Sequence, residues 1–211
     1  MRGWWLVAVM LVATAPSGLA AAQKKTVKAP AAKAATKTSL DVTCPSDLGQ
    51  GIKSKRTFCD VTVGTDPAAG IVMRVPPHSG PTTLYFDLHN RFAVSGSVLP
   101  FARASALVAV VNGNNGGLIE RAAVLGELRT ELDLFDRLAG SGPGSSRTVA
   151  PGRAQAVKVT VPAAVTSISI VGVRLEVTNK DGRAEYATAG RPVAIGSNFR
   201  IEYTPAVVSK Q

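Results

Sequence analysis

The residues of this chain best suited to chemistry are its two histidines and an aspartate close to one of them. His78 and His89 are the only histidines in the sequence. Asp87 stands two residues before His89, so both side chains point to one face of an extended strand, and Arg91 continues that face. An Asp–His pair of this kind can bind a metal ion or orient an imidazole as a general base. The candidate binding residues are Tyr85, Asp87, His89, Arg91 and His78.

A structural role is the alternative explanation for this group. Outward-facing polar side chains are common in antiparallel strands. Zinc sites normally use three or four protein ligands, and the sequence does not reveal a third or fourth beside Asp87 and His89. The chain also lacks a Gly-x-Ser-x-Gly nucleophile motif. We therefore expect no metal site and no cofactor. Non-enzymatic binding or scaffolding is favoured, with a hydrolase or metal-dependent enzyme using Asp87 and His89 as the alternative.

Cys44 and Cys59 are the only cysteines, and they stand fifteen positions apart. In a chain that leaves the reducing cytosol, such a pair predicts a single disulfide. A metal or redox role is disfavoured because there is no Cys-x-x-Cys motif and no histidine near either cysteine. Closing a loop of this length stabilises a fold by about 3 kcal/mol in the chain-entropy treatment.

The first 22 residues have the pattern of a secretory signal peptide. A short basic start at Met1–Arg2 precedes an apolar run from Trp4 to Ala15, and a helix-breaking Pro16–Gly18 and the small residues Ala20–Ala22 follow. This order predicts an exported protein, periplasmic or extracellular, with no membrane span after cleavage. A retained N-terminal anchor is the alternative, because the uncharged stretch is close to the length that spans a bilayer.

The formal net charge of +10 is concentrated near the start of the chain. The segment 23–39 carries five lysines and no acidic residue, whereas residues 40–211 carry 18 Lys and Arg against 14 Asp and Glu, a net +4. We interpret 23–39 as a flexible Lys/Ala/Pro-rich spacer before a folded domain at 40–211. The alternative is that its lysines contact an envelope protein, an anionic envelope polymer or lipid headgroups. Nucleic acid is excluded as a partner by export.

The elements that position these residues are predicted to be β-strands. Apolar and polar residues alternate with a period of two in several short runs, which is typical of half-buried antiparallel strands. Turn signals separate the runs, notably Asn179–Gly182 and Asn112–Gly117. About ten strands are expected in a single antiparallel β-sandwich, of immunoglobulin-like or jelly-roll topology. The clearest runs are 71–75, 82–90, 102–111, 157–161, 173–178 and 199–204.

One segment departs from this alternation. Between Leu118 and Leu138 the apolar residues recur with helical spacing. Thr130, followed by acidic residues, has the features of a helix start, and Gly140 those of a helix stop. We predict a strand over 118–129, with a helix as the alternative there, and a short helix over 131–139.

Overall fold

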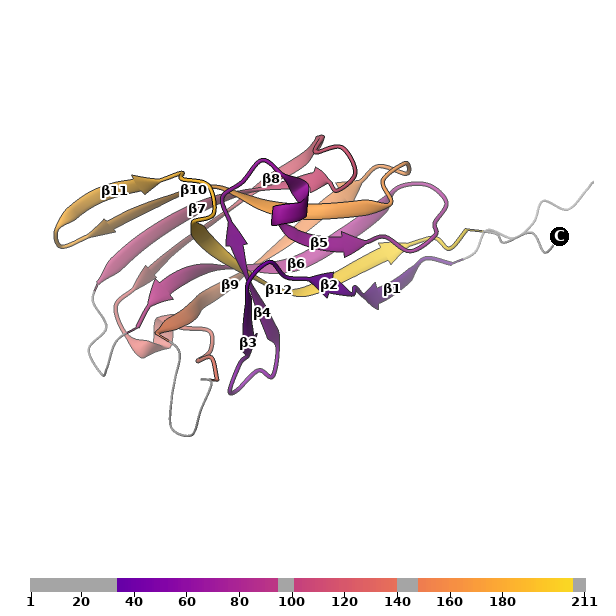
Figure 1. Cartoon of the computed structure of the whole chain (residues 1–211). Coiled ribbons are helices and arrows are strands. Elements are labelled where there is room, and N and C mark those ends of the chain that lie inside the picture. The colour runs from indigo at the N-terminus through magenta and orange to yellow at the C-terminus, as the bar shows by residue number, and fades with distance from the viewer. Residues whose placement is uncertain (1–33, 95–100, 140–147, 207–211) are drawn as a thin grey trace, which may run out of the picture. The chain divides into compact units, whose positions relative to one another are not determined.

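Two antiparallel sheets packed face to face make up the described residues, 34–94, 101–139 and 148–206 of this computed structural model (Figure 1). Sheet 1 has the order β3-β4-β12-β6-β9, with β1 also paired to β12. Sheet 2 has the order β2-β5-β10-β7-β8, with β11 also paired to β10. The predicted signal peptide and most of the predicted spacer lie outside the described residues.

The elements follow one another closely along the chain. Their bounds are β1 Thr36–Ser39, β2 Val42–Thr43, β3 Asp47–Gln50, β4 Thr57–Thr62, β5 Ile71–Arg74, β6 Thr82–Ala93, β7 Ala102–Asn112, β8 Leu118–Leu128, β9 Val149–Val161, β10 Ser167–Asn179, β11 Gly182–Tyr186 and β12 Pro192–Tyr203. Two single 3-10 turns, Pro67–Ala69 and Glu131–Asp133, interrupt the strands. The all-β prediction is confirmed, with twelve strands described rather than about ten.

The strand pairing is nested, and this nesting decides the topology. β4 pairs with β12, β5 with β10, β6 with β9 and β7 with β8. These eight strands therefore follow the path of one long hairpin that is wound into a double layer. The pairs β12–β6 and β10–β7 complete the two sheets. This is the strand order of a jelly roll, and it settles the choice that the sequence leaves open.

The predicted alternation corresponds to the core between the two sheets. The inward side chains of β6 are almost completely buried, and so are those of the neighbouring strands. The strand predicted over 118–129 is confirmed as β8, and the two predicted turns close the hairpins β7–β8 and β10–β11. Representative core residues are Val61, Ile71, Leu84, Phe86, Leu88, Val108, Val110, Ile168, Ile170 and Ile201.

The predicted helix over 131–139 is wrong. Only Glu131–Asp133 forms a single 3-10 turn. The chain leaves this turn in an extended conformation at Leu134, which bridges to Gly152 of β9, and Leu138 bridges to Gly51, the residue after β3. Leu132, which the helical spacing placed on the apolar side, is 82% exposed. Phe135 packs instead against apolar residues on the outer side of sheet 1, and this burial favours the extended path. No helix within the described ranges is long and apolar enough to cross a bilayer.

The N-terminal part of the domain is connected to both sheets, through a disulfide and through the pairing of β1. The predicted disulfide is confirmed: Cys44 is bonded to Cys59, with a Cα–Cα distance of 5.5 Å. Cys44 follows β2 of sheet 2 and Cys59 lies in β4 of sheet 1, so the bond connects the two layers. Thr36–Ser39, the last four residues assigned to the spacer, form β1 and pair with β12. The folded part of the chain therefore starts earlier than residue 40.

Candidate functional site

Asp87 and His89 lie on one face of β6, as their spacing predicts, but this face is covered. His89 is fully buried and Asp87 is 8% exposed. A second hydrophobic cluster lies over this part of sheet 1, on the side away from the main core. Because of this covering layer, the pair faces an interior rather than solvent. The cluster comprises Leu48, Phe58, Phe135, Leu138, Val149 and Ile195.

The imidazole of His89 is held by hydrogen bonds on both nitrogens. Its Nδ1 lies 2.8 Å from the carbonyl oxygen of Gly152, and its Nε2 lies 2.9 Å from the Oγ of Ser197. Since a carbonyl can only accept, Nδ1 carries the proton and Nε2 accepts from the Ser197 hydroxyl. The ring also contacts Phe58 and Phe135, with centroids 5.6 and 5.0 Å away. Burial lowers the pKa of His89, because the imidazolium loses hydration there.

The imidazole of His89 has the chemistry of a general base and the hydroxyl of Ser197 that of a nucleophile, but neither side chain is accessible. Both side chains are 0% exposed, whereas nucleophilic catalysis requires an Oγ that a substrate can reach. Asp87 is occupied as well: Nη1 of Arg56 lies 2.6 Å from its carboxylate and Nδ2 of Asn198 donates to it over 2.9 Å. Within the described ranges, no three His, Cys, Asp or Glu side chains gather into a group able to hold a metal ion.

His78 does not join this cluster. Its Nδ1 lies 2.8 Å from the carbonyl oxygen of Pro76, and its backbone bridges to Pro205. Pro205 follows the end of β12, whereas His89 pairs with Ile195 inside β12, ten residues earlier in the chain. At the rise of an extended strand, ten residues span roughly 30 Å. The two histidines therefore belong to different ends of sheet 1.

Tyr85 lies beyond the covered region, on the open part of the outer face of sheet 1. The Nζ atoms of Lys37 and Lys158 lie 3.8 and 5.9 Å from the centre of its ring. In the strand register Tyr85 is opposite Arg200 on β12 and opposite Lys158 on β9. Four strands thus bring three cations around one aromatic ring. We call Lys37, Tyr85, Lys158 and Arg200 the basic patch.

One carboxylate partly balances the basic patch. The hydroxyl of Tyr85 donates to Glu202 over 2.9 Å, and this hydrogen bond raises the pKa of Tyr85. With three cations and one carboxylate, the surface carries a net charge of +2. The Nε of Arg200 is buried and has no hydrogen-bond partner among the described residues. The guanidinium is therefore not neutralised by a close carboxylate within the described chain.

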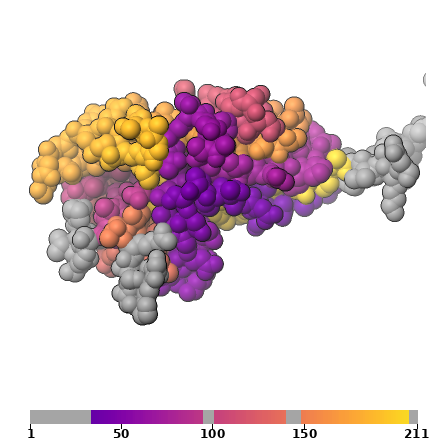
Figure 2. Space-filling model, viewed as in Figure 1, coloured from indigo at the N-terminus to yellow at the C-terminus, as the bar shows by residue number. Residues whose placement is uncertain are grey.

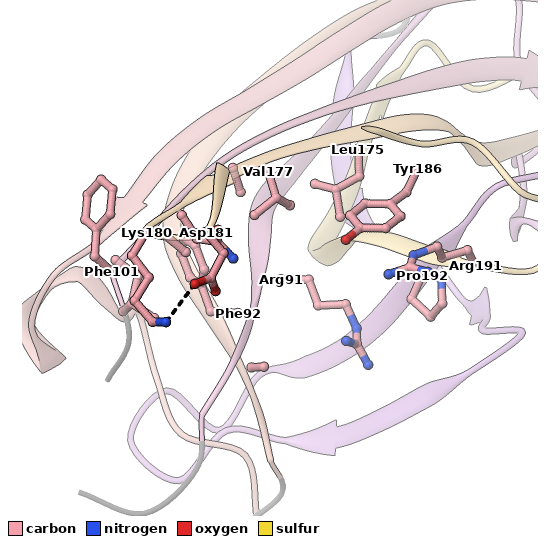
Figure 3. A pocket seen from close by; sticks show the side chains of 15 residues that line it. Arg91, Phe92, Phe101, Leu175, Val177, Lys180, Asp181, Tyr186, Arg191 and Pro192 are labelled. Carbon is pink, nitrogen blue, oxygen red and sulfur yellow. Dashed lines mark hydrogen bonds and ion pairs between the residues drawn. The ribbon is translucent and has the colours of Figure 1, made fainter. Parts of the chain in front are cut away.

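A cleft of about 510 Å³ opens between the two sheets at one end of the sandwich (Figure 3). It lies where β6 and β8 end, where β7 and β12 begin, and beneath the β10–β11 hairpin, which forms the upper left of the surface in Figure 2. Arg91 borders the cleft from β6, and its Nε is paired with Asp60 over 2.9 Å. The apolar part of the lining is Phe92, Ala102, Ala104, Leu128, Leu175 and Val177.

Polar and aromatic side chains form the rim of this inter-sheet cleft. The guanidinium of Arg191 lies over the ring of Tyr186, 3.7 Å from its centroid. Lys180 is paired with Asp181 over 2.7 Å, as drawn in Figure 3. Phe101 is 43% exposed at the rim. Arg191 makes no ion pair with any described residue, so it is the uncompensated cation of the rim.

The comparisons with known proteins do not identify a function for this chain. The chain matches no protein-family model and no curated relative. A solved structure with some likeness is the K1 cleaved adhesin domain of Lys-gingipain from Porphyromonas gingivalis W83. The alignment has 8% identity and a TM-score of 0.34, and it covers 82% of this chain and 99% of that one. A likeness this low carries no argument about activity.

The residues of the cleft could not be found from local sequence patterns. Phe101, Tyr186 and Arg191 come from three different strand ends and share no spacing in the sequence. Only the nested pairing of the jelly roll brings these strand ends together. The one usable signal was their position beside turn-forming residues, since binding residues often lie where rigid strands give way to loops.

Proposed function

We propose that this chain is an exported, non-enzymatic binding module that holds a linear anionic polymer of the cell envelope against the basic patch. The observation that carries this proposal is the convergence of Lys37, Lys158 and Arg200 around the ring of Tyr85. A cation held against an aromatic face keeps its position while its remaining donors stay available to an anion.

The arrangement of the basic patch suits an extended polymer. Arg200, Tyr85 and Lys158 occupy one row across three neighbouring strands. Because strands in a sheet lie about 4.8 Å apart, the backbone positions at the two ends of this row are about 10 Å apart. Lys37 belongs to the next row, opposite Glu202. Such a flat array can meet several successive anionic groups of one chain.

The sequence before β1 extends the same charge. Four further lysines stand at positions 24, 25, 28 and 33, and no acidic residue separates them from Lys37. β1 joins sheet 1 beside Arg200, so this segment is tethered at the edge of the basic patch. Two weak contacts on one tether reinforce each other through effective concentration. The segment 23–39 is therefore proposed to assist binding as well as to act as a spacer.

A polymer is favoured over a membrane surface because, among the described residues, the strands of the basic patch expose no large hydrophobic side chain. Peripheral membrane binding needs apolar side chains that insert between the headgroups. The large hydrophobic side chains that are exposed in the described ranges all lie outside β1, β6, β9 and β12. They are Ile52, Phe101, Leu118, Leu125 and Leu132.

Export and a non-enzymatic role complete the proposal. Export is supported by the signal-peptide pattern at residues 1–22 and by the disulfide between Cys44 and Cys59, because such bonds persist in oxidising compartments. A binding role is supported by the burial of His89 and Ser197, which leaves the candidate base and hydroxyl without access to a substrate.

The test is binding of the mature chain to polygalacturonate and dextran sulfate, with neutral dextran as the reference. The variant Lys37→Gln/Lys158→Gln removes two exposed cations of the basic patch. Arg74→Gln/Arg121→Gln is the matched control, since it removes the same charge from exposed positions of sheet 2. At about 1 kcal/mol for each cation near an anionic surface, the patch variant should bind about tenfold or more weakly.

The control variant should bind both anionic polymers as the unchanged chain does, and neutral dextran should not bind. Affinity should also fall as salt is raised, because exposed charges are screened. Equal weakening by the two variants would mean that only net charge matters, and it would reject the basic patch as a site. Stronger binding to anionic lipid vesicles than to either polymer would assign the surface to membranes instead.

A further inference from the structure

We infer that the inter-sheet cleft is a second, separate binding site, and that it takes a small amphipathic anion with an aliphatic body and a carboxylate head. The cleft and the basic patch are built from different residues. The inference therefore does not depend on the proposed polymer binding.

The aliphatic body is assigned from the lining. Phe92, Leu128, Leu175 and Val177 line the cleft from both sheets, together with the small side chains of alanines. Phe92 and Leu128 belong to the buried core, so the cleft is an open continuation of that core. The apolar surface that remains exposed in the cleft, at Ala102, Val177 and Phe101, gains free energy when a hydrocarbon chain displaces water from it. A volume of about 510 Å³ lies within the usual range of small-molecule sites.

The carboxylate head is assigned from the charges at the rim. Arg91 is already paired with Asp60, and Lys180 with Asp181. Arg191 is the remaining cation, and its guanidinium lies over the ring of Tyr186, 3.7 Å from the centroid. The edge of a guanidinium held in this way presents parallel N–H donors, the geometry that binds a carboxylate through two hydrogen bonds. Because one rim cation, Arg191, has no ion pair with a described residue, we expect the ligand to carry one anionic head group.

Phe101 accounts for the entrance. It is one of the few large hydrophobic side chains exposed in the described ranges, and it borders the cleft from the start of β7. The guanidinium of Arg129 lies over its ring, 5.7 Å from the centroid, and a bound aliphatic chain would cover the part of the ring that stays exposed. These three features define one binding mode, with the head at Arg191 and the tail directed toward Leu175 (Figure 3) and toward Leu128, which also lines the cleft.

In the experiment, decanoate, decylammonium and decanol are titrated into the mature chain, the two ions below their micelle concentrations and decanol below its solubility limit. Calorimetry gives the affinities, and methyl NMR spectra locate the contacts. Decanoate should bind most tightly and shift the methyl signals of Leu128, Leu175 and Val177. Arg191→Gln should weaken decanoate about tenfold or more, as expected for a hydrogen bond to a charged group, and leave decanol unchanged. Arg183→Gln, a change in β11 outside the lining, is the matched control, since it removes the same charge close in the chain to Arg191.

Three results would overturn the inference. These are methyl shifts outside the cleft, equal affinity for decanoate and decylammonium, and equal effects of Arg191→Gln and Arg183→Gln. The NMR measurement needs no variant, so a folding defect in Arg191→Gln does not leave the inference untested. Decanoate should not displace polygalacturonate from the basic patch. Failure of one site is therefore distinguishable from failure of the other.

Discussion

The Nε2 of His89 accepts a hydrogen bond from the hydroxyl of Ser197 over 2.9 Å, inside a region that water does not reach. On the other side of the ring, Nδ1–H donates to the carbonyl of Gly152. The imidazole thereby joins β6 to both of its neighbours, β12 and β9. The residue that the sequence marks as the best candidate for proton transfer is thus placed where it can stabilise the sheet.

This placement predicts that stability depends on pH through His89. Burial holds its folded-state pKa below the ordinary value of 6.5. Below about pH 6.5 the unfolded chain takes up a proton that the folded chain resists, so the free energy of unfolding falls as the pH falls. The slope for one group is at most about 1.4 kcal/mol per pH unit. Urea unfolding of the wild type at pH 7.5, 6.5 and 5.5 should show this loss.

The variant His89→Gln isolates that contribution. It removes the titrating group while keeping a side chain that can donate and accept hydrogen bonds. It should be less stable than the wild type at pH 7.5, and the difference between the two should shrink toward pH 5.5. A constant difference across this range would contradict the assigned protonation state.

A second prediction concerns Asp136, whose carboxylate organises the layer over His89. It is 3% exposed and accepts hydrogen bonds from the backbone N–H groups of Lys53, Ser54 and Arg137 at 3.0, 2.7 and 2.7 Å. Asp136→Ala should cost about 2–3 kcal/mol, because these buried donors lose a charged acceptor. Thermal and urea unfolding measure the loss. Asp181→Ala, an exposed change in a turn, is the control and should stay within about 0.5 kcal/mol of the wild type.

A third prediction concerns the disulfide between Cys44 and Cys59. The double variant Cys44→Ala/Cys59→Ala should unfold about 3 kcal/mol more easily, since the bond closes a loop of 15 residues and connects the two sheets. Differential scanning calorimetry with and without reductant checks this. Reductant should lower the melting temperature of the wild type and leave that of the double variant unchanged. If complete reduction left the melting temperature of the wild type unchanged, the disulfide would not contribute to stability.

The sequence predicts those parts of the fold that depend on residues close together in the chain. Alternation is a local property, and it correctly predicts β6 and places Leu84 and Phe86 in the core. It also places Asp87 and His89 on the opposite face. Whether that face meets water depends on Phe58 and other residues distant in the chain, which no local pattern reports. The burial of His89 was therefore beyond prediction from spacing.

The error at 131–139 has a related cause. The helical spacing of apolar residues does not show which of these side chains pack against another part of the fold. Leu138 finds one on the outer side of sheet 1, whereas Leu132 remains in solvent. Tertiary packing thus overrides the periodicity of the segment. Local spacing does not reveal the cleft for the same reason, because the fold alone places Arg191 and Phe101 in the lining of one cleft.

The last prediction tests the contact between the two sheets at Asn90. This residue of β6 is 1% exposed, and its Nδ2 donates across the core to the carbonyl oxygens of Ala104 and Val124, at 3.1 and 3.3 Å. Gly126 lies opposite Ala104 in the register, and a Cβ added there would overlap with Oδ1 of Asn90. Gly126→Ala should therefore destabilise the fold by about 1–3 kcal/mol through overpacking.

Asn90→Ala should cost about 1–3 kcal/mol for the lost hydrogen bonds, and it also empties the space that the new methyl group needs. The double variant Asn90→Ala/Gly126→Ala should consequently be more stable than the sum of the two single losses implies, with a coupling of about 0.5 kcal/mol or more. Urea unfolding of all four chains gives this coupling directly. Simple additivity would show that the two sheets do not approach each other at Asn90 as closely as the structure has them.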